Sequence, residues 1–285
     1  MKSSHLKDAV TMIRFIRKVK EMSSAGELPD EYGLGKILDD MRIQGGAETL
    51  SFKTICAYKE NSAIVHYIAH EKTAKKIKPE GFLLVDSGGQ YRFEGTTDIT
   101  RTISLSQPTE EEKHVYTTVL KGNLRLMNMI FPRGFKGSLL DTSAENVLWS
   151  EGYFCGHGIG HGVGCYLSVH ESEARISRGE GVREVSFQTG VIVSDEPGVY
   201  LEGKFGVRLE NLLLVEKANS IDGHDMCRFV PLTLVPFDKE SIDMSLLDDN
   251  DKKILTDYNE MIFENVGPHL EEDERSWLKE IIDIK

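Results

Sequence analysis

The amino-acid sequence predicts an α+β fold in which two similar halves surround a shared cleft. Three observations lead to this prediction. Helical patterns are followed by strand patterns twice along the chain, two strand pairs that carry carboxylates resemble each other, and 285 residues are enough to bury a sizeable core. The composition, with 40% hydrophobic and 28% charged residues, is that of a globular protein.

The first half begins with helices and continues with extended segments. Apolar residues recur at helical spacing over residues 9–19, and a second helical stretch covers residues 32–41. Extended segments are expected at residues 51–58, 63–69 and 81–85. This half is therefore predicted to contain two helices followed by three strands.

The second half repeats this order. Thr109 and Glu112 have the spacing of a capping box, so a helix is expected to begin there. A further helix is predicted at residues 139–149, and strands punctuated by glycine follow over residues 154–215. The repeated order of elements favours two halves built alike.

Each half contains an apolar strand that ends in a carboxylate and is followed by a returning strand with another carboxylate. The first half has Asp86 and Asp98, and the second half has Glu196 and Glu210. In both, a glycine stands two residues after the first acid, and a tyrosine precedes the returning strand. This weak internal echo suggests that the four acids face one cleft.

Hairpins that oppose the two acids of each pair would turn at Arg92 in the first half and at Gly203 in the second. Directly opposed residues have Cβ atoms ~5 Å apart. Two unpaired carboxylates at so short a distance repel each other, and a cation bound between them removes the repulsion. The alternative is that the acids form salt bridges with Arg101 and Arg208, and the spacing alone leaves both interpretations open.

Glycine occupies every second position over residues 156–164, which contain His157 and His161. A strand with this pattern has one bare face, which another strand or a ligand can approach closely. Four residues of strand span ~13 Å, so one histidine as a metal ligand and the other as a pocket residue is the better geometry. A zinc-binding HEXXH helix is excluded because no glutamate follows His157.

Charge and composition exclude several classes of function. With 34 basic and 46 acidic residues the net charge is −12, which argues against nucleic-acid binding. The apolar runs are far shorter than the ~18 residues of a membrane span, and the first residues lack the pattern of a secretory signal. Four cysteines without a CxxC pair indicate reduced thiols, so we expect a cytoplasmic protein without membrane contact.

Together these motifs resemble the catalytic domain of the pita-bread metallopeptidases, which include methionine aminopeptidases, prolidases and Xaa-Pro aminopeptidases. The resemblance covers nearly the whole chain and is strongest to the soluble eukaryotic-type Xaa-Pro aminopeptidases. It is carried by Leu84-Val-Asp86-Ser-Gly, Thr96-Thr-Asp98-Ile-Thr, His157-Gly-Ile-Gly-His161-Gly, Val169-His170-Glu171, Ser194-Asp-Glu196-Pro-Gly and Val207-Arg-Leu-Glu210-Asn.

The resemblance implies a pita-bread fold with two pseudo-symmetric α+β halves around a cleft that holds two divalent metal ions. Its implied metal ligands are Asp86, Asp98, His161, Glu196 and Glu210. In this family Asp98 and Glu210 would bridge the two ions. A carboxylate-rich site of this kind favours Mn²⁺, with Zn²⁺ or Co²⁺ as substitutes.

The resemblance also implies the remaining catalytic and substrate-binding residues. His66, His157 and His170 match pocket histidines, with His170 acting on the transition state. Glu196 would serve as general base as well as ligand, and Arg208 would hold the network around the bridging carboxylate. The implied reaction is hydrolysis of the N-terminal Xaa-Pro peptide bond, with a peptide that has proline second as substrate.

The resemblance further sets expectations about domain organisation. Residues 1–240 correspond to the catalytic domain, and residues 241–285 to a C-terminal helical extension packed on it. The N-terminal creatinase-like domains of the family, which help dimerisation, are expected to be absent, although a homodimer remains compatible with the resemblance. The segment from Asp86 to Asp98 is one residue longer than usual, which a bulge at the hairpin tip can absorb.

Two other functions compete with this prediction. An Xaa-Pro dipeptidase would have the same five ligands and would differ in whether the cleft tolerates a third substrate residue. A non-catalytic pita-bread binding module is the rival from another class. Modules of that kind lose metal ligands, whereas all five are present here.

Overall fold

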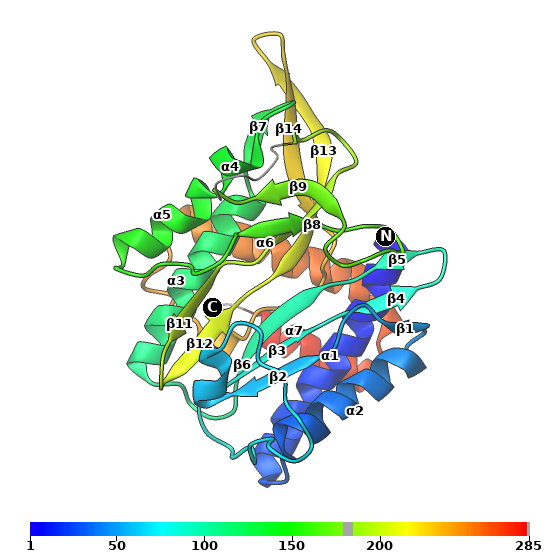
Figure 1. Cartoon of the computed structure of the whole chain (residues 1–285), viewed down its shortest axis with the longest axis vertical. Coiled ribbons are helices and arrows are strands. Elements are labelled where there is room, and N and C mark those ends of the chain that lie inside the picture. The colour runs from blue at the N-terminus through cyan, green and yellow to red at the C-terminus, as the bar shows by residue number, and fades with distance from the viewer. Residues whose placement is uncertain (179–184, 284–285) are drawn as a thin grey trace.

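The first half of the chain consists of two helices followed by two small antiparallel sheets (Figure 1). The computed structural model describes residues 1–178 and 185–283. The elements of this half are α1 (Lys2–Ala25), α2 (Glu31–Gln44), β1 (Thr49–Leu50), β2 (Ile55–Tyr58), η1 (Lys59–Ala63), β3 (Phe82–Ser87), β4 (Gly89–Tyr91), β5 (Gly95–Thr96) and β6 (Ile99–Ser104). Strand β3 lies between β2 and β6, and β4 lies between β1 and β5. The structure confirms both predicted helices and the strand at 81–85.

Helix α1 forms because its apolar residues recur on one face, and that face is buried. Its buried apolar residues are Ala9, Met12, Ile13, Phe15, Ile16 and Val19. Gly26 ends the helix with a positive φ of 71°. Helix α2 then begins at the N-cap Asp30, whose carboxylate accepts a hydrogen bond of 2.7 Å from the Gly33 N–H. Both helices thus have the start or stop signals that their sequences carry.

The extended segment predicted at residues 63–69 is wrong. The short 3-10 helix η1 ends at Ala63, residues 64–66 form a bend and a turn, and residues 67–69 are coil. The polar groups of this segment bond to side chains and to β12 instead of a strand ladder: the Tyr67 hydroxyl donates to Glu31, and the Ser62 hydroxyl accepts from the Gly206 N–H. Tertiary contacts have therefore overridden the local strand pattern.

The register predicted for the first hairpin is wrong as well, by two positions. Asp86 on β3 lies opposite Thr100 on β6, and Asp98 precedes β6. The turn is centred on Phe93 rather than Arg92, and Phe93 has a positive φ of 62°. The second hairpin is confirmed, because Gly198 lies opposite Arg208 and the turn is centred on Gly203, whose φ is 73°.

In the second half most strands follow the helices, as predicted, but a short strand separates the first helix from the next, and the helix predicted at residues 139–149 is divided into two. The elements of this half are α3 (Glu110–Met127), β7 (Ile130–Pro132), α4 (Gly137–Leu140), α5 (Thr142–Ser150), β8 (Gly160–Gly162), β9 (Ser172–Ile176), β10 (Ile192–Asp195), β11 (Gly198–Leu201), β12 (Phe205–Arg208), β13 (Asn211–Ile221) and β14 (His224–Pro231). The capping box of Thr109 and Glu112 is confirmed at the start of α3. Six strands form one sheet in the order β7-β14-β13-β10-β8-β9, and the β13–β14 hairpin projects from the molecule in Figure 1.

The glycine-rich segment is extended over only part of its predicted length. Strand β8 covers Gly160–Gly162, whereas residues 156–157 form a bend in which the His157 Nδ1 atom lies 2.8 Å from the Gly158 carbonyl oxygen. The predicted close approach is confirmed at Gly160, where a Cβ atom would lie 2.0 Å from the Ser194 carbonyl oxygen. Glycine therefore lets β8 lie directly against β10.

The two halves meet along the strands that carry the acids. The Glu210 N–H donates to the Thr100 carbonyl at 3.1 Å, and the Thr102 hydroxyl donates to the Arg208 carbonyl at 3.1 Å. These bonds join β6 of the first half to the end of β12 in the second. The predicted acids therefore face one another across the junction between the halves.

The C-terminal elements are η2 (Lys239–Ser241), α6 (Asp249–Val266), η3 (Gly267–His269) and α7 (Glu272–Ile282). The helical extension expected at residues 241–285 contains α6 and α7, and α6 packs against α1 and α3. An ion pair of 2.8 Å between Arg14 and Glu274 joins α1 to α7. None of the helices in the described ranges is both long and apolar enough to cross a lipid bilayer.

Candidate metal centre

One cavity of about 680 Å³ lies where the two halves meet, and every site residue predicted from the sequence lines it. The predicted residues are His66, Asp86, Asp98, His157, His161, His170, Glu196, Arg208 and Glu210. They come from sequence positions up to 144 residues apart (His66 to Glu210), so the fold, and not local proximity, assembles them. The wall also contains the apolar residues Ile55, Val65, Ile68 and Val169 and the basic residues Lys53 and Arg175.

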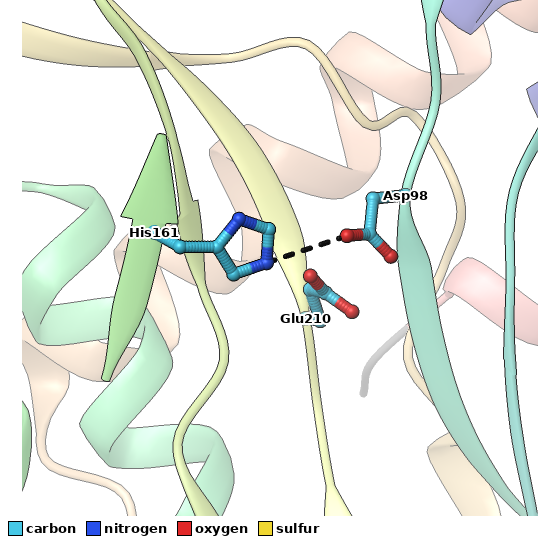
Figure 2. A group of neighbouring side chains, drawn as sticks. All are labelled: Asp98, His161 and Glu210. Atoms are coloured by element: carbon cyan, nitrogen blue, oxygen red, sulfur yellow. Dashed lines mark ion pairs between the residues drawn. The ribbon is translucent and has the colours of Figure 1, made fainter. Parts of the chain in front are cut away.

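Asp98, His161 and Glu210 form the centre of the site (Figure 2). One ligand atom from each lies within 4.8 Å of the others. The His161 Nε2 atom is 3.5 Å from the Asp98 Oδ2 atom and 3.3 Å from the Glu196 Oε1 atom. The three side chains come from β8 and from the segments just before β6 and β13, and they point toward a common space.

Two carboxylate oxygens at this centre are buried without a hydrogen bond. They are the Asp86 Oδ1 and Glu210 Oε1 atoms, which find no partner in the described part of the chain. Burial raises the pKa of Asp86 and Glu210, and it raises the pKa of Asp98 to about 6. Unpaired buried carboxylates are costly unless a cation compensates them. Oxygen-rich donors with one imidazole fit divalent ions such as Mn²⁺ or Zn²⁺.

The negative charge at this centre also changes the pKa of the His161 imidazole. Burial alone would lower the pKa of His161, but the adjoining Asp98 and Glu196 carboxylates raise that pKa to about 9. Ser194 links the two residues, because its hydroxyl accepts from the backbone N–H of His161 at 2.9 Å and donates to the Glu196 Oε1 atom at 3.1 Å. Ser194 stands in the motif that contains Glu196, but no role was predicted for it.

Arg208 connects several members of the site. Its Nη2 atom donates to the Asp86 Oδ2 atom at 2.6 Å, and its Nε atom donates to the Thr100 hydroxyl at 3.1 Å. Thr100 in turn donates to the Glu210 Oε2 atom at 2.7 Å. One guanidinium thus orients two carboxylates and leaves one oxygen of each free to face the cavity.

The salt-bridge alternative therefore holds for only one of its two arginines. Arg208 pairs with Asp86, as that alternative required. Arg101 instead donates to the carbonyls of Thr100 and Glu210 and to the side chain of Asn211. Neutralisation of four acids by two arginines is excluded, because only one of the two arginines reaches a carboxylate.

The pocket histidines surround this centre. The ring centroids of His170 and His161 are 4.2 Å apart with the rings nearly perpendicular. His157 is partly buried, with its Nε2 atom 2.6 Å from the Tyr200 hydroxyl, and His66 is exposed where it lines the cavity. Burial, and then the neighbouring His161, lower the pKa of His170.

Tyr200 is a site residue that the sequence reasoning missed. Its hydroxyl contacts the His157 ring and accepts from the Arg208 Nη1 atom at 2.9 Å. It therefore links a pocket histidine to the arginine that orients Asp86. The repeated tyrosine before each returning strand was a signal that could have identified it.

Comparison with protein families gives two matches that together cover most of the chain. The model of metallopeptidase family M24 matches residues 1–217. A model of the C-terminal region of peptidase_M24 matches residues 225–283.

The curated proteins to which the chain is similar include Xaa-Pro aminopeptidases. The chain is 38% identical to a probable Xaa-Pro aminopeptidase P of Paracoccidioides brasiliensis over 98% of this chain and 46% of the relative. It is 36% identical to Xaa-Pro aminopeptidase 2 of Mus musculus over 98% of this chain and 41% of the relative. The chain therefore spans about half the length of the curated relatives it matches.

Solved structures agree with this likeness. An X-prolyl aminopeptidase from Caenorhabditis elegans, described as a cytosolic enzyme with a di-nuclear active site, aligns with a TM-score of 0.94 and 34% identity over 100% of this chain and 47% of that chain. An X-Pro aminopeptidase from Thermotoga maritima aligns with a TM-score of 0.66 and 30% identity over 82% of this chain and 61% of that chain. A prolidase from Pyrococcus furiosus aligns with a TM-score of 0.62 and 27% identity over 80% of this chain and 62% of that chain.

Proposed function

The chain belongs to metallopeptidase family M24 and has the pita-bread fold, and from this premise we propose that it removes the N-terminal residue from peptides whose second residue is proline. The observation that carries the proposal is the convergence of four carboxylates and His161 in one cavity, with two buried oxygens unpaired. The similar proteins of known name that cover nearly all of this chain are Xaa-Pro aminopeptidases.

The proposed metal site consists of Asp86, Asp98, His161, Glu196 and Glu210. Asp98 and Glu210 would be central to holding the ions, because each has an oxygen within 4.8 Å of the His161 ligand atom in the centre of the cluster. When bound, the two ions supply Lewis-acid activation of a water molecule near neutral pH. Manganese is the proposed metal, since carboxylates make up four of the five ligands.

The remaining roles belong to the side chains of the chain itself. Glu196 is proposed to accept the proton of the attacking water, as general base. Its Oε1 atom, 3.3 Å from His161, supports this role because it faces the same centre. His170 is proposed to donate a hydrogen bond to the developing oxyanion, and its lowered pKa is consistent with a neutral ring that still carries one N–H donor.

Selection of proline must come from the shape of the pocket, because the proline nitrogen has no N–H to be recognised. His66 and His157 are proposed to contact the substrate, with the apolar Val65 and Ile68 beside them. Arg208 is proposed to act mainly by fixing Asp86 and, through Thr100, Glu210.

Three further proposals concern the domain bounds, the location and the oligomeric state of the protein. Residues 1–240 are proposed to form the catalytic domain, with residues 241–285 as its extension; the ion pair between Arg14 and Glu274 supports close packing of the two. A cytoplasmic location is proposed because a similar enzyme of Caenorhabditis elegans is described as cytosolic. A homodimer is also proposed, and its test is the molecular mass in solution.

The function is tested by peptide hydrolysis. The purified chain is incubated with Xaa-Pro dipeptides and with Xaa-Pro-Xaa tripeptides, each in the presence of Mn²⁺ or of a chelator. We expect metal-dependent release of the first residue from the tripeptides. Cleavage of dipeptides alone would identify a dipeptidase, and no cleavage by a chain that binds two ions would favour the non-catalytic binding module.

A further inference from the structure

Glu31, the first residue of α2, is a buried carboxylate that is fully occupied by hydrogen bonds from one segment of the chain. Its side chain is completely buried. Four donors reach it, two at each oxygen: the Tyr58 N–H at 2.8 Å, the Asn61 side-chain amide at 2.9 Å, the Tyr67 hydroxyl at 2.7 Å and the Lys75 N–H at 2.8 Å. All four are uncharged groups, so the carboxylate acts here as a multiple acceptor and not as half of an ion pair.

The four donors lie within residues 58–75, which contain His66. This segment begins with the last residue of β2 and contains η1, and the rest of it is bend, turn and coil, so few of its conformational restraints are local. Tyr67 and Ile68 pack on the buried cluster of Ile55, Ala57 and Leu84. The neighbouring His66, Val65 and Ile68 line the cavity of the metal centre. Glu31 thus lies behind the wall that presents His66.

The same segment is held from its other side by β12. The Ser62 hydroxyl accepts from the Gly206 N–H at 2.7 Å, and a Cβ atom at Gly206 would lie 2.1 Å from the Ser62 carbonyl oxygen. Arg208 donates to the Val65 carbonyl at 3.5 Å. Residues 62–65 therefore lie against β12, which carries Arg208. Glu31 accepts hydrogen bonds from residues that precede and residues that follow His66 in the sequence.

Only a carboxylate fits this arrangement. An ionised carboxylate accepts at both oxygens, whereas a glutamine side chain has one acceptor oxygen and an NH₂ group that can only donate. If glutamine replaced Glu31, its NH₂ group would face two of the four hydrogen-bond donors that now bond to the Glu31 carboxylate. Two donors cannot bond to each other. The segment would have to move to restore its hydrogen bonds, since buried donors left unpaired are costly.

We propose that Glu31 is a positioning residue of the peptidase site, which acts by holding residues 58–75 so that His66 faces the bound substrate. This inference rests on the proposed function and adds to it a residue that touches neither the metal ligands nor the substrate. Because His66 contacts substrate and not the metals in the proposed function, loss of Glu31 should weaken substrate binding more than it slows the chemical step.

The test compares Glu31→Gln, Tyr67→Phe and Asp40→Asn, each alone and combined with His66→Ala. Tyr67→Phe removes one of the four donors and keeps the ring, and Asp40 is an exposed acid on the same helix. With Xaa-Pro-Xaa substrate, Glu31→Gln should raise KM about 10-fold with kcat within about 2-fold of the parent. Tyr67→Phe should do so more weakly, and Asp40→Asn should match the parent.

Two further readouts separate positioning from general stability. Metal content should stay unchanged in all three variants, and amide hydrogen exchange over residues 58–75 should become faster in Glu31→Gln. In the His66→Ala background, Glu31→Gln should raise KM no further, because the residue through which it acts is gone.

Three results would overturn the inference. They are an equal KM effect of Glu31→Gln with and without His66, a loss confined to kcat, or unchanged KM in a variant whose residues 58–75 exchange faster. If Glu31→Gln does not fold, Tyr67→Phe is scored by the same comparison. Failure of the parent chain to cleave any Xaa-Pro peptide would instead refute the proposed function itself.

Discussion

Asp86 and Arg208 form an ion pair of 2.6 Å across the junction of the two halves, and this pair engages only one of the two carboxylate oxygens. The other oxygen, Oδ1, is buried with no hydrogen-bond partner within residues 1–178 and 185–283. Glu210 has the same arrangement, with one oxygen bonded to Thr100 and the other free. The protein thus orients these carboxylates while keeping one lone-pair face of each directed at the centre.

Replacement of Arg208 by lysine should weaken metal binding. Lysine keeps the charge but cannot donate to Asp86, Thr100 and Tyr200 at once, as the guanidinium does. Loss of such an orienting group typically lowers metal affinity by about 10- to 100-fold. Competition titration with a metal-binding dye measures the change, and Arg228→Lys, at an exposed site on β14, is the matched control. Equal affinity of Arg208→Lys and the parent would show that the network does not prepare the ligands.

Substitutions in the site should separate ligands from pocket residues. Asp98→Ala and Glu196→Ala should abolish turnover and lower metal occupancy, because each removes a proposed ligand. His170→Ala should keep its metals and lose about 100-fold in kcat, as expected for loss of one oxyanion donor. Metal analysis and kinetics on the same preparations make the distinction. Loss of metal in His170→Ala would mean that His170 is a ligand.

The stability of the fold should fall in mild acid through His5. Burial lowers the pKa of His5 from 6.5 to about 4, and its Nε2 atom has no hydrogen-bond partner in the described chain. A base with a depressed folded-state pKa binds protons more readily when unfolded, so its contribution is lost as pH falls from 6.5 toward 4. Between pH 7 and pH 5 the loss should be about 2 kcal/mol.

Chemical denaturation at the two pH values measures this effect. His5→Phe should show a smaller loss of unfolding free energy between pH 7 and pH 5 than the parent, because the titrating group is gone. His224→Gln, at an exposed histidine, should keep the full dependence. The same pH dependence in His5→Phe would assign the acid sensitivity to other groups.

A substitution in the turn of the first hairpin should raise the free energy of unfolding. Phe93 has a φ of 62° and a side chain that is 93% exposed, so it occupies a left-handed conformation without packing in return. Phe93→Asn should raise the unfolding free energy by about 1 kcal/mol, since asparagine adopts this conformation more readily. Thermal denaturation compares it with Phe93→Leu, which removes the ring without relieving the backbone. Equal stability of the two variants would contradict this account of the turn.

The cavity residues could be identified because the resemblance to the pita-bread metallopeptidases implies them position by position, whereas the spacing of the acids alone left salt bridges open as an alternative. The second hairpin could be predicted because Gly203 marks its turn, whereas Phe93 is a residue that hairpin rules do not favour in a left-handed position. The shape of residues 63–69 could not be predicted, because it depends on Glu31 and Gly206, which are distant in sequence. Tyr200 was missed because its role depends on contacts to His157 and Arg208, and the repeated tyrosine before each returning strand indicates its position but not those contacts.

The most direct test of the central claim is the ratio of kcat/KM for a peptide with proline second to that for the same peptide with alanine second. The assay uses the purified chain with Mn²⁺, and a chelator in the control. The pocket formed by His66, His157 and the apolar wall should favour the proline peptide by about 100-fold, and the chelator should abolish both rates. Equal cleavage of the two peptides, or cleavage that survives metal removal, would contradict the account.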